Sequence, residues 1–247
     1  MQLALLALAG LVAGAVNAVA GGGSLLLFPA LLAVGLPPLD ANVTNSVAQW
    51  PSYLGAATGQ RRDLAGQGPR LRRVVPVAAV GALVGALLLL VAPEGVFDAL
   101  VPALVIGASL LMAAQPWLKR VVGTPDPGAP DRPLPLLAAV FLAAVYGGYF
   151  GGALGVILVV LLALTASDTL RRLNATKAVL SLTSATVTIV VFGLYAPVHW
   201  GYVAALAPAT LLGGFLGGRL AGRLDERVLR AVVVVLGLAV GVALIVT

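Results

Sequence analysis

The chain consists of two halves that repeat one another. Residues 76–85 return as residues 208–217, with a proline and two glycines at matching places 132 positions later. The same offset carries Asn42-Val-Thr44 onto Asn174-Ala-Thr176. The sequence is also strongly apolar, with 60% hydrophobic and only 10% charged residues, whereas an average soluble domain has about 25% charged residues. In so apolar a chain, this repeat predicts a membrane transporter made of two related halves with a site between them.

Residue types exclude several classes of protein. The chain has no cysteine, which excludes disulfides, thiolate metal sites and cysteine catalysis. Its single histidine, His199, offers no metal cluster, and the carboxylates fall at or near the ends of apolar runs. The sequence contains no phosphate-binding loop and no serine triad. We therefore expect no enzyme, no catalytic residue, no metal site and no cofactor.

Apolar runs divide each half into five segments. In the first half they cover residues 2–20, 24–36, 42–59, 74–92 and 98–117, and in the second half residues 134–150, 152–166, 174–193, 203–220 and 228–246. A helix needs about 20 residues to cross the hydrocarbon core of a bilayer, and the segments 24–36 and 152–166 are too short for that. We expect both to be half-helices or re-entrant segments, each entered through a glycine cluster.

A polar linker separates the two repeats. Residues 119–133 are rich in proline, glycine and charge, which is typical of an exposed loop. The linker divides the chain into a first membrane repeat, residues 1–118, and a second, residues 134–247. Residues 1–20 have the apolar content of a signal peptide, but no lysine or arginine precedes the run. We expect them to remain part of the folded protein.

Arginine placement predicts the orientation of the repeats. Loop 60–73 carries five arginines, whereas the matched loop 194–202 has no arginine or lysine. The bias reverses at the next pair of loops, because residues 93–95 have none and residues 219–230 have four. Positive loops favour the cytoplasmic side. The repeats are therefore predicted to be inverted, in a multi-pass protein of the cell (inner or plasma) membrane. The linker and the loops 60–73 and 219–230 would be cytoplasmic, with both termini outside.

The same rule explains the net charge of +6, so we expect no nucleic-acid partner. Glycines spaced four apart in apolar helices are expected to form packing faces, either within the protomer or across a dimer. These glycines are Gly81, Gly85, Gly213 and Gly217.

Two glycine clusters mark the expected helix breaks. They are Gly21-Gly22-Gly23-Ser24 and Gly147-Gly148-Tyr-Phe-Gly151-Gly152, and each precedes a short segment. Irregular backbone at membrane depth must be buried in protein or line a watered cavity, and helix N-termini that point into such a cavity bind anions. The alternative is that these glycines only permit close helix packing.

Polar residues gather at the start of the segments that follow the half-helices. Asn45 and Gln49 share a helical face, which should look into a cavity because polar groups in lipid are costly. Asn42 and Asn174 have an alternative role as helix N-caps. Lys177, which aligns with Asn45, is expected either to meet a partner or an anionic substrate or to snorkel to the cytoplasmic interface. The candidate substrate-binding residues are Gly22, Gly23, Ser24, Asn42, Thr44, Asn45, Gln49, Gly151, Gly152, Asn174, Thr176 and Lys177.

A set of motifs runs through both halves in order. The first half has Gly21-Gly-Gly-Ser-Leu-Leu-Leu-Phe-Pro29, Gly35-Leu-Pro-Pro38, Ala41-Asn-Val-Thr-Asn-Ser-Val-Ala-Gln-Trp-Pro51 and Arg61-Arg62. The second half has Tyr149-Phe-Gly-Gly152, Leu173-Asn-Ala-Thr-Lys177 and the run 208–217. With these motifs, essentially the whole chain resembles the TauE/SafE-like sulfite exporter family.

The resemblance implies a polytopic, dimeric transporter with inverted repeats, whose substrates are sulfite, related sulfur oxyanions or organosulfonates. Substrate pockets in that family lie where the broken helices of the two repeats meet. This carries over to Asn42, Thr44, Asn45, Gln49, Asn174 and Lys177. One departure is Pro197-Val-His-Trp200, where an acidic residue is expected before the tryptophan.

The expected fold class is an all-α polytopic membrane protein of two inverted repeats, each with a broken or re-entrant helix at a glycine-rich hinge. The expected function is a secondary transporter that exports sulfite or a related sulfur anion, held between the broken helices. A passive anion channel, a carrier of another small anion, a membrane scaffold and a cation carrier are the alternatives. The expected partners are the small anion, the lipid bilayer and a second copy of the chain.

Overall fold

The computed structural model describes residues 2–93, 95–122, 131–220 and 226–246. Within these ranges the chain forms ten α-helices, one short 3-10 helix and no strand, so the expected all-α fold is confirmed. The helices are α1 (Gln2–Val19), α2 (Ser24–Ala33), α3 (Pro38–Gly59), η1 (Arg61–Leu64), α4 (Gly68–Val91), α5 (Val96–Val122), α6 (Pro133–Tyr149), α7 (Leu154–Thr165), α8 (Leu170–Tyr195), α9 (Trp200–Leu220) and α10 (Glu226–Val246).

Five of the described helices are long and apolar enough to cross a membrane, by length and composition. The spans are Gly68–Val91, Val96–Leu118, Leu170–Tyr195, Trp200–Arg219 and Arg227–Val246. Shorter apolar stretches lie in α1, α2, α6 and α7. The expected multi-pass membrane protein is confirmed, and α2 and α7 have the lengths expected of half-helices.

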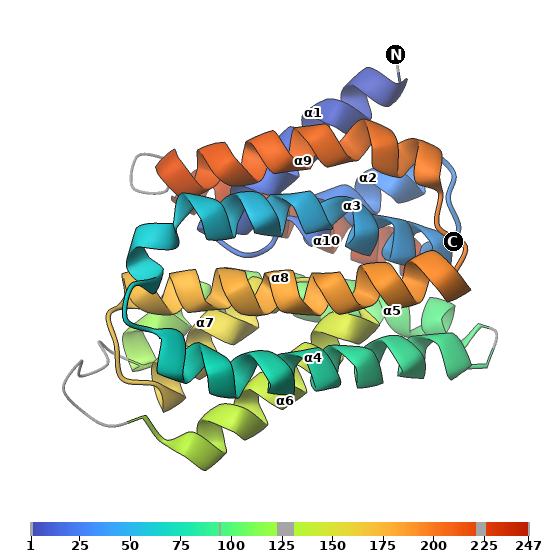
Figure 1. Cartoon of the computed structure of the whole chain (residues 1–247). Helices are drawn as coiled ribbons and strands as arrows, with labels where there is room; N and C mark the ends of the chain where they lie inside the picture. The colour runs from blue at the N-terminus through green and yellow to red at the C-terminus, as the bar shows by residue number, and fades with distance from the viewer. Residues whose placement is uncertain (1, 94, 123–130, 221–225, 247) are drawn as a thin grey trace.

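The two halves interleave and do not form separate bodies (Figure 1). Helix α1 packs along α9, and α6 packs along α4 in the same way. Helix α3 also packs on α9 and α8 on α4, while α5 pairs with α10 and α3 with α8. Each of these contacts has a counterpart when the two halves are exchanged. The colours of Figure 1 also show that α4 and α9, which correspond in the repeat, run in opposite directions across the molecule.

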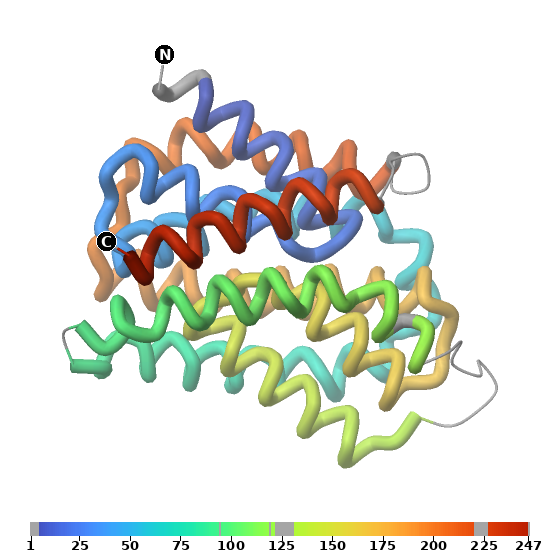
Figure 2. Tube along the Cα trace, turned by 180° about the vertical axis from the view of Figure 1, so that it is seen from behind, coloured from blue at the N-terminus to red at the C-terminus, as the bar shows by residue number. Residues whose placement is uncertain are grey.

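Both predicted breaks are present, and each turns the chain back inside the molecule. Gly21 lies between α1 and α2 with φ of +81°, and Gly151 lies between α6 and α7 with φ of +76°, a conformation that favours glycine. Figure 2 shows α2 returning toward the end of the molecule where α1 begins. At the second break, the backbone N–H of Arg132, just before α6, donates to the carbonyl of Thr165 at the end of α7 (3.0 Å). Both half-helices are therefore re-entrant.

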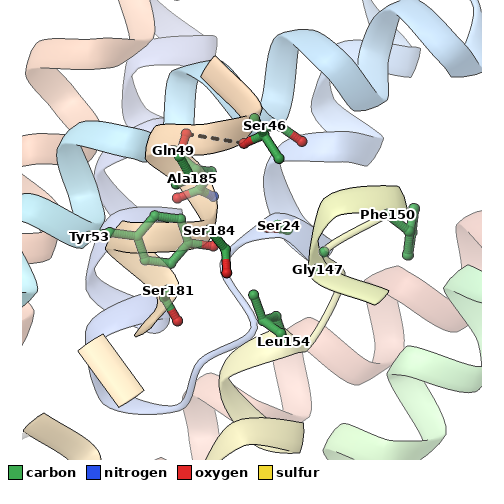
Figure 3. Close-up of a pocket in the computed structure, with 12 residues that line it drawn as sticks. Ser24, Ser46, Gln49, Tyr53, Gly147, Phe150, Leu154, Ser181, Ser184 and Ala185 are labelled. Atoms are coloured by element: carbon green, nitrogen blue, oxygen red, sulfur yellow. Dashed lines mark hydrogen bonds between the residues drawn. The ribbon is translucent and has the colours of Figure 1, made fainter. Parts of the chain in front are cut away.

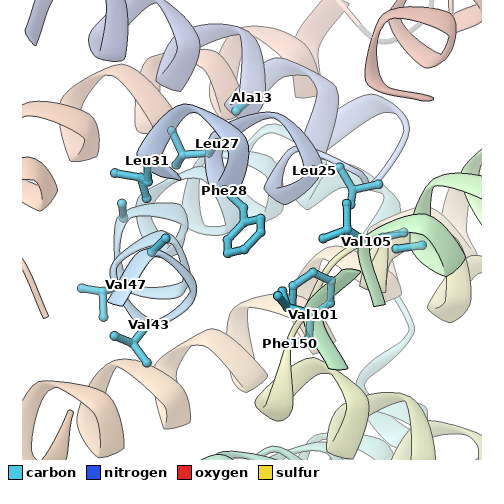
Figure 4. Packing of buried hydrophobic residues seen from close by; sticks show 14 of the residues in the cluster. Ala13, Leu25, Leu27, Phe28, Leu31, Val43, Val47, Val101, Val105 and Phe150 are labelled. Atoms are coloured by element: carbon cyan, nitrogen blue, oxygen red, sulfur yellow. The ribbon is translucent and has the colours of Figure 1, made fainter. Parts of the chain in front are cut away.

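An apolar core holds α2 in place (Figure 4). The side chains of Leu25, Leu27, Phe28 and Leu31 are at most 1% exposed. The ring of Phe28 meets that of Phe150 edge-on, with centroids 5.8 Å apart. Because Phe150 belongs to the second break, this contact joins the half-helix of one repeat to the hinge of the other.

Glycines bring helices of opposite halves into backbone contact. A Cβ at Gly213 of α9 would collide with the carbonyl oxygen of Leu11 in α1, and one at Gly85 of α4 would collide with that of Val145 in α6. Gly81 lies in the same contact between α4 and α6, and Gly217 lies in the same contact between α9 and α1. The expected packing faces are confirmed, and they lie within one chain.

The starts of α3 and α8 differ from the prediction. Helix α3 begins at Pro38 and α8 at Leu170, each one turn before Asn42 and Asn174. Proline suits a first helical position, and the side chain of Thr169 caps α8. The N-cap role of Asn42 and Asn174 is therefore wrong, because both residues lie inside their helices.

The non-helical connection between the repeats is shorter than the predicted linker, because helices extend into both of its ends. Helix α5 continues to Val122 and α6 begins at Pro133, so both ends of the predicted linker 119–133 are helical. Residues 123–130 of the linker and residues 221–225 of the predicted loop 219–230 lie outside the described residues.

An ion cluster ties three segments together at the arginine-rich end. Arg70 of α4 donates to both carboxylate oxygens of Asp131 at 2.8 Å and to Asp168 at 2.9 Å. Arg172 of α8 reaches the other oxygen of Asp168 at 2.8 Å. Burial would raise the pKa of each aspartate, but the hydrogen bonds from the arginines outweigh it and hold both pKa values below the usual range. Both carboxylates therefore stay charged well into acid.

Gly213→Val is expected to separate α1 from α9, because the new side chain meets the backbone of Leu11. Overpacking of this kind costs about 1–3 kcal/mol. The measurement is the thermal midpoint of the purified protein in detergent. Gly201→Ala in the same helix is the matched control, since no atom lies within 4 Å of its new Cβ. Equal midpoints for the two variants would contradict this packing.

Asp168→Asn is expected to lower the free energy of unfolding at neutral pH by about 2 kcal/mol, as for a lost hydrogen bond to a charged group. Because the folded-state pKa of Asp168 is lowered, its stabilisation is complete above the ordinary pKa of about 3.9 and is lost as the pH falls through the lowered value. Thermal midpoints of the wild type and the variant should therefore converge below about pH 4.

Asp63→Asn is the control for the ion cluster. The partner of Asp63 is Arg171, whose side chain is 81% exposed, and such surface pairs contribute about 0.5 kcal/mol. If Asp168→Asn changed the midpoint by the same amount at every pH, the ionised carboxylate would not be the stabilising group.

Candidate functional site

The two breaks meet at a small cavity whose lining includes many polar side chains (Figure 3). Its lining comes from α2, α3, α8 and the α6–α7 break. The lining residues are Ser24, Ser46, Gln49, Tyr53, Gly147, Phe150, Gly151, Leu154, Ser181, Ser184, Ala185 and Thr188. Ser24 and Leu154 are the first residues of α2 and α7. Both half-helices thus begin at the same cavity.

The cavity presents hydroxyl and amide groups without charge. Four serines, Tyr53 and Thr188 supply hydroxyls, Gln49 supplies an amide, and none of the lining residues in the described part of the chain is charged. The volume open to the centre of a water molecule is about 20 Å³, which is room for about one water. A larger ligand therefore requires the surrounding helices to move apart.

Gln49 has the least satisfied side chain at the cavity. It is 1% exposed, and neither its Nε2 nor its Oε1 makes a hydrogen bond within the described residues. The Oγ of Ser181 on α8 is likewise without a partner there. Buried polar groups are hydrogen-bonded in the great majority of cases, and an unsatisfied one costs about 1–3 kcal/mol. These two side chains therefore leave hydrogen-bonding capacity unused beside the cavity.

Lys177 lies behind the cavity wall and not at the interface. It is 3% exposed, and its Nζ donates to the backbone carbonyl of Asn17 at the end of α1 (3.5 Å). The snorkelling alternative is therefore wrong, because the side chain turns into the molecule. Ser181, one turn further along the same face of α8, lines the cavity. Asn17 donates in turn to the Oγ of Ser52 at 3.3 Å and lies beside Tyr53 of the cavity wall.

Only some of the predicted binding residues are brought together here. Ser24, Gln49 and Gly151 line the cavity. Asn45 lies on the face of α3 that carries Gln49, is 2% exposed, and its Oδ1 makes no hydrogen bond among the described residues. Of the twelve predicted binding residues, only Ser24, Asn45, Gln49, Gly151 and Lys177 therefore lie at or near the cavity.

The remaining predicted glycines shape the breaks and do not line the cavity. Gly22 packs against Met112 of α5, and Gly23 packs against the backbone of α1. The carbonyl of Gly152 accepts a hydrogen bond from the hydroxyl of Tyr146 at 2.6 Å. Their close contacts fit the packing alternative for these three residues.

Asn42 and Thr44 bind other parts of the fold. The amide of Asn42 donates to the carbonyl of Tyr149 at the end of α6 (3.1 Å). The hydroxyl of Thr44 accepts from the backbone N–H of His199 (3.1 Å), and His199 Nε2 lies 2.8 Å from Asp40 Oδ2. The position before Trp200 departs from the expected acidic residue, but Asp40 of α3 supplies a carboxylate beside it in space.

Asn174 and Thr176 belong to a separate polar network at the arginine-rich end. Asn174 donates to the side chain of Gln60 at 2.8 Å, and Thr176 donates to that of Gln67 at 2.6 Å. Gln60 and Gln67 flank η1, so this network ties α8 to the connection between α3 and α4. Neither residue lines the cavity between the breaks.

The candidate list missed several polar residues of the site, namely Asn17, Ser46, Tyr53, Ser181, Ser184 and Thr188. Tyr53 follows Gln49 by one helical turn, so the face that carries Asn45 and Gln49 continues through it. Asn17 is a polar residue just before the first glycine cluster, inside an apolar run. The helical periodicity could have identified Tyr53, and the polar residue in an apolar run could have identified Asn17. Within the described ranges, no group of three or more His, Asp or Glu side chains comes together to hold a metal.

A multi-pass helical protein whose two helix breaks meet at a cavity lined by polar side chains has the architecture of a membrane transporter. Residues 6–244 match the family described as sulfite exporter TauE/SafE. The chain belongs to this family, which confirms the resemblance seen in the sequence motifs.

Relatives with curated names are similar to most of the chain or to part of it. A probable membrane transporter protein, ORF9, of a Sinorhizobium species is 35% identical over 62% of this chain and 58% of its own length. A probable membrane transporter protein of Haemophilus influenzae is 27% identical over 85% of this chain and 82% of its own length. The probable membrane transporter protein YfcA of Escherichia coli is 29% identical over 63% of this chain and 56% of its own length.

The chain therefore spans less than two thirds of the length of the Sinorhizobium and Escherichia coli relatives. No solved structure gives a significant match. The family and the relatives' names support a membrane transporter.

Gln49→Leu is expected to leave the thermal midpoint unchanged or to raise it. The substitution removes two buried amide atoms that have no partner in the described structure, so no hydrogen bond is lost. Thr210→Val is the matched control, because the buried hydroxyl of Thr210 donates to the carbonyl of Ala48 at 2.7 Å and its loss should cost about 1 kcal/mol. A larger loss for Gln49→Leu than for Thr210→Val would mean that Gln49 supports the fold.

Proposed function

We propose that this protein is a secondary transporter of the cell membrane that exports sulfite, or a related sulfur oxyanion or organosulfonate. The observation that carries the proposal is the cavity at which both half-helices begin, lined by hydrogen-bond donors and by no carboxylate among the described residues. The family's description supports the substrate class and the direction of transport. The relatives' names point to a transporter rather than an enzyme.

A small anion suits the chemistry of this cavity. Helices α2 and α7 have 10 and 12 residues, and each directs the partial positive charge of its N-terminus to the cavity. The hydroxyls and the Nε2 of Gln49 can donate hydrogen bonds to oxyanion oxygens. Lys177 adds a buried positive charge behind the wall. A metal cation would find none of the carboxylate ligands that it prefers.

Two inverted repeats would allow the protein to open alternately to the two sides of the membrane. The exchange of helix contacts between the halves and the opposite directions of α4 and α9 support inverted topology. In this proposal the arginine-rich loops 60–73 and 219–230 and the linker face the cytoplasm, and the start of α1 and the end of α10 face outward. Alternating access then opens the central cavity to one side at a time. The protein acts as a homodimer, as the family resemblance implies.

A cavity with room for about one water favours a carrier that encloses its substrate over a passive anion channel, which needs a continuous path.

Counterflow in proteoliposomes tests the proposal. Vesicles that contain the purified protein and are loaded with unlabelled sulfite should take up labelled sulfite in a saturable manner. A panel of sulfate, thiosulfate, an alkyl sulfonate, phosphate and acetate, each with and without a proton gradient, should show preference for the sulfur anions. Counterflow of phosphate or acetate but of no sulfur anion would overturn the substrate assignment. Steady unitary currents in a bilayer recording would show that the protein is a channel and not a carrier.

Lys177→Met should reduce sulfite counterflow about tenfold or more, because a hydrogen bond to a charged group is worth about 1.5–3 kcal/mol and each 1.4 kcal/mol is tenfold. The variant keeps the length of the side chain and removes its charge. Arg73→Met is the matched control, since it removes the same charge at an exposed position of α4. Near-normal flux in correctly inserted Lys177→Met protein would show that the charge serves the fold only.

A further inference from the structure

A second hollow lies far from the polar cavity, at the arginine-rich end of the molecule. It is formed where α3 and α9 end, where η1 runs and where α8 begins, all at one end of Figure 1. Its lining residues are Thr58, Gly59, Arg61, Arg62, Asp63, Arg171, Phe215, Gly218 and Arg219. The hollow measures about 520 Å³, which is within the size range of small-molecule sites, about 300–1,000 Å³.

The charge in this hollow is strongly positive. Four arginines and one aspartate line it, and Asp63 is paired with Arg171. Arg61, Arg62 and Arg219 are exposed and make no ion pair within the described ranges. Among the described residues, three guanidinium groups therefore line one space without an ion-paired carboxylate. The preference of arginine for the cytoplasmic side explains their presence at this end but not their convergence on a hollow.

One aromatic ring, that of Phe215, lines the hollow, and exposed leucines lie next to it on α9. The guanidinium carbon of Arg219 lies 4.2 Å from the centre of the Phe215 ring. Leu212, Leu216 and Arg219 follow one another at spacings of four and three residues, so they share one face of α9. Leu212 is 56% exposed and Leu216 is 46% exposed. Because the membrane span of α9 ends at Arg219, this face leads from the bilayer core directly to the arginines.

A ligand that matches this surface has an anionic oxygen-rich group joined to a long apolar body. The arginine side chain offers a planar fork of donors that binds phosphate oxygens in pairs. Exposed leucines of α9 supply a surface for acyl chains below the arginines. A soluble anion would use the charges but not the leucine face.

We propose that this hollow binds the phosphate headgroup of an anionic phospholipid, with the acyl chains along α9. The site is separate from the transport cavity and does not depend on which substrate is carried. Basic pockets between helices on the cytoplasmic side are a recurrent way to hold anionic lipids. The bound headgroup would neutralise part of the charge that η1, α8 and α9 bring together.

Lipid binding to the purified full chain in nanodiscs or detergent tests the site. Phosphatidylglycerol, phosphatidylcholine and inorganic phosphate are titrated separately and binding is read by native mass spectrometry and by the thermal midpoint. The triple variant Arg61→Gln, Arg62→Gln and Arg219→Gln should bind phosphatidylglycerol on the order of 100-fold more weakly, which is the conversion of about 1 kcal/mol for each of three arginines at 1.4 kcal/mol per tenfold change.

The matched control is the triple variant Arg72→Gln, Arg73→Gln and Arg120→Gln, which removes the same charge from exposed positions outside the hollow. It should bind phosphatidylglycerol as the wild type does, and phosphatidylcholine should bind to neither. An equal loss in both triple variants would show diffuse attraction and overturn the site. Binding of inorganic phosphate as tight as that of phosphatidylglycerol would identify a soluble-anion site instead.

Discussion

Two stretches of non-helical backbone lie inside a membrane-spanning fold, and the needs of their peptide groups govern the rest of the structure. Lipid offers no partner to a free N–H or C=O group, so each break has to be covered by protein. At the second break, Asn42 donates to the carbonyl of Tyr149, and Tyr146 donates to that of Gly152. At the first break a side chain also satisfies a backbone group, because Gln115 donates to the carbonyl of Ala20. Polar side chains thus complete the backbone that glycine interrupts.

This requirement divides the polar residues into two groups. Asn42 and Tyr146 satisfy backbone carbonyls of a break and are committed to the fold. The side chains of Gln49 and Ser181 are buried and make no hydrogen bond at all in the described structure, whereas Asn42 leaves only its Oδ1 without a partner. In the proposed transporter, the second group is where a polar ligand would bind without breaking a hydrogen bond of the fold. Lys177 belongs with the first group, because its ammonium contacts the carbonyl of Asn17, and Ser181 on the same face of its helix lines the cavity.

Local patterns predicted the elements of this fold better than the directions of its side chains. The repeat, the two breaks and the close approach at Gly85 and Gly213 follow from spacing along the chain, and all are present. Thr44 and Thr176 were predicted to bind substrate but are bonded to His199 and Gln67. These partners lie more than 100 positions away in sequence, so helix periodicity could not identify them.

The predicted starts of α3 and α8 were wrong for a related reason. Asparagine is a good N-cap in isolation, yet Pro38 and Thr169 begin their helices one turn earlier and leave Asn42 and Asn174 inside. The pairing of Asn45 with Lys177 in the repeat remains informative, since both residues are buried at equivalent places while only one is charged. A near-symmetric scaffold therefore holds an asymmetric charge.

The glycine contact between α1 and α9 also constrains how the protein is made. Gly213 fits closely against Leu11, so α1 acquires its main neighbour only after about 200 further residues are synthesised. At about 5–20 residues per second, α1 must wait on the order of 10–40 s. During this time α1 has to stay in the membrane without its glycine-rich partner. The second half of the chain is therefore needed to complete the packing of the first, and the two halves assemble together.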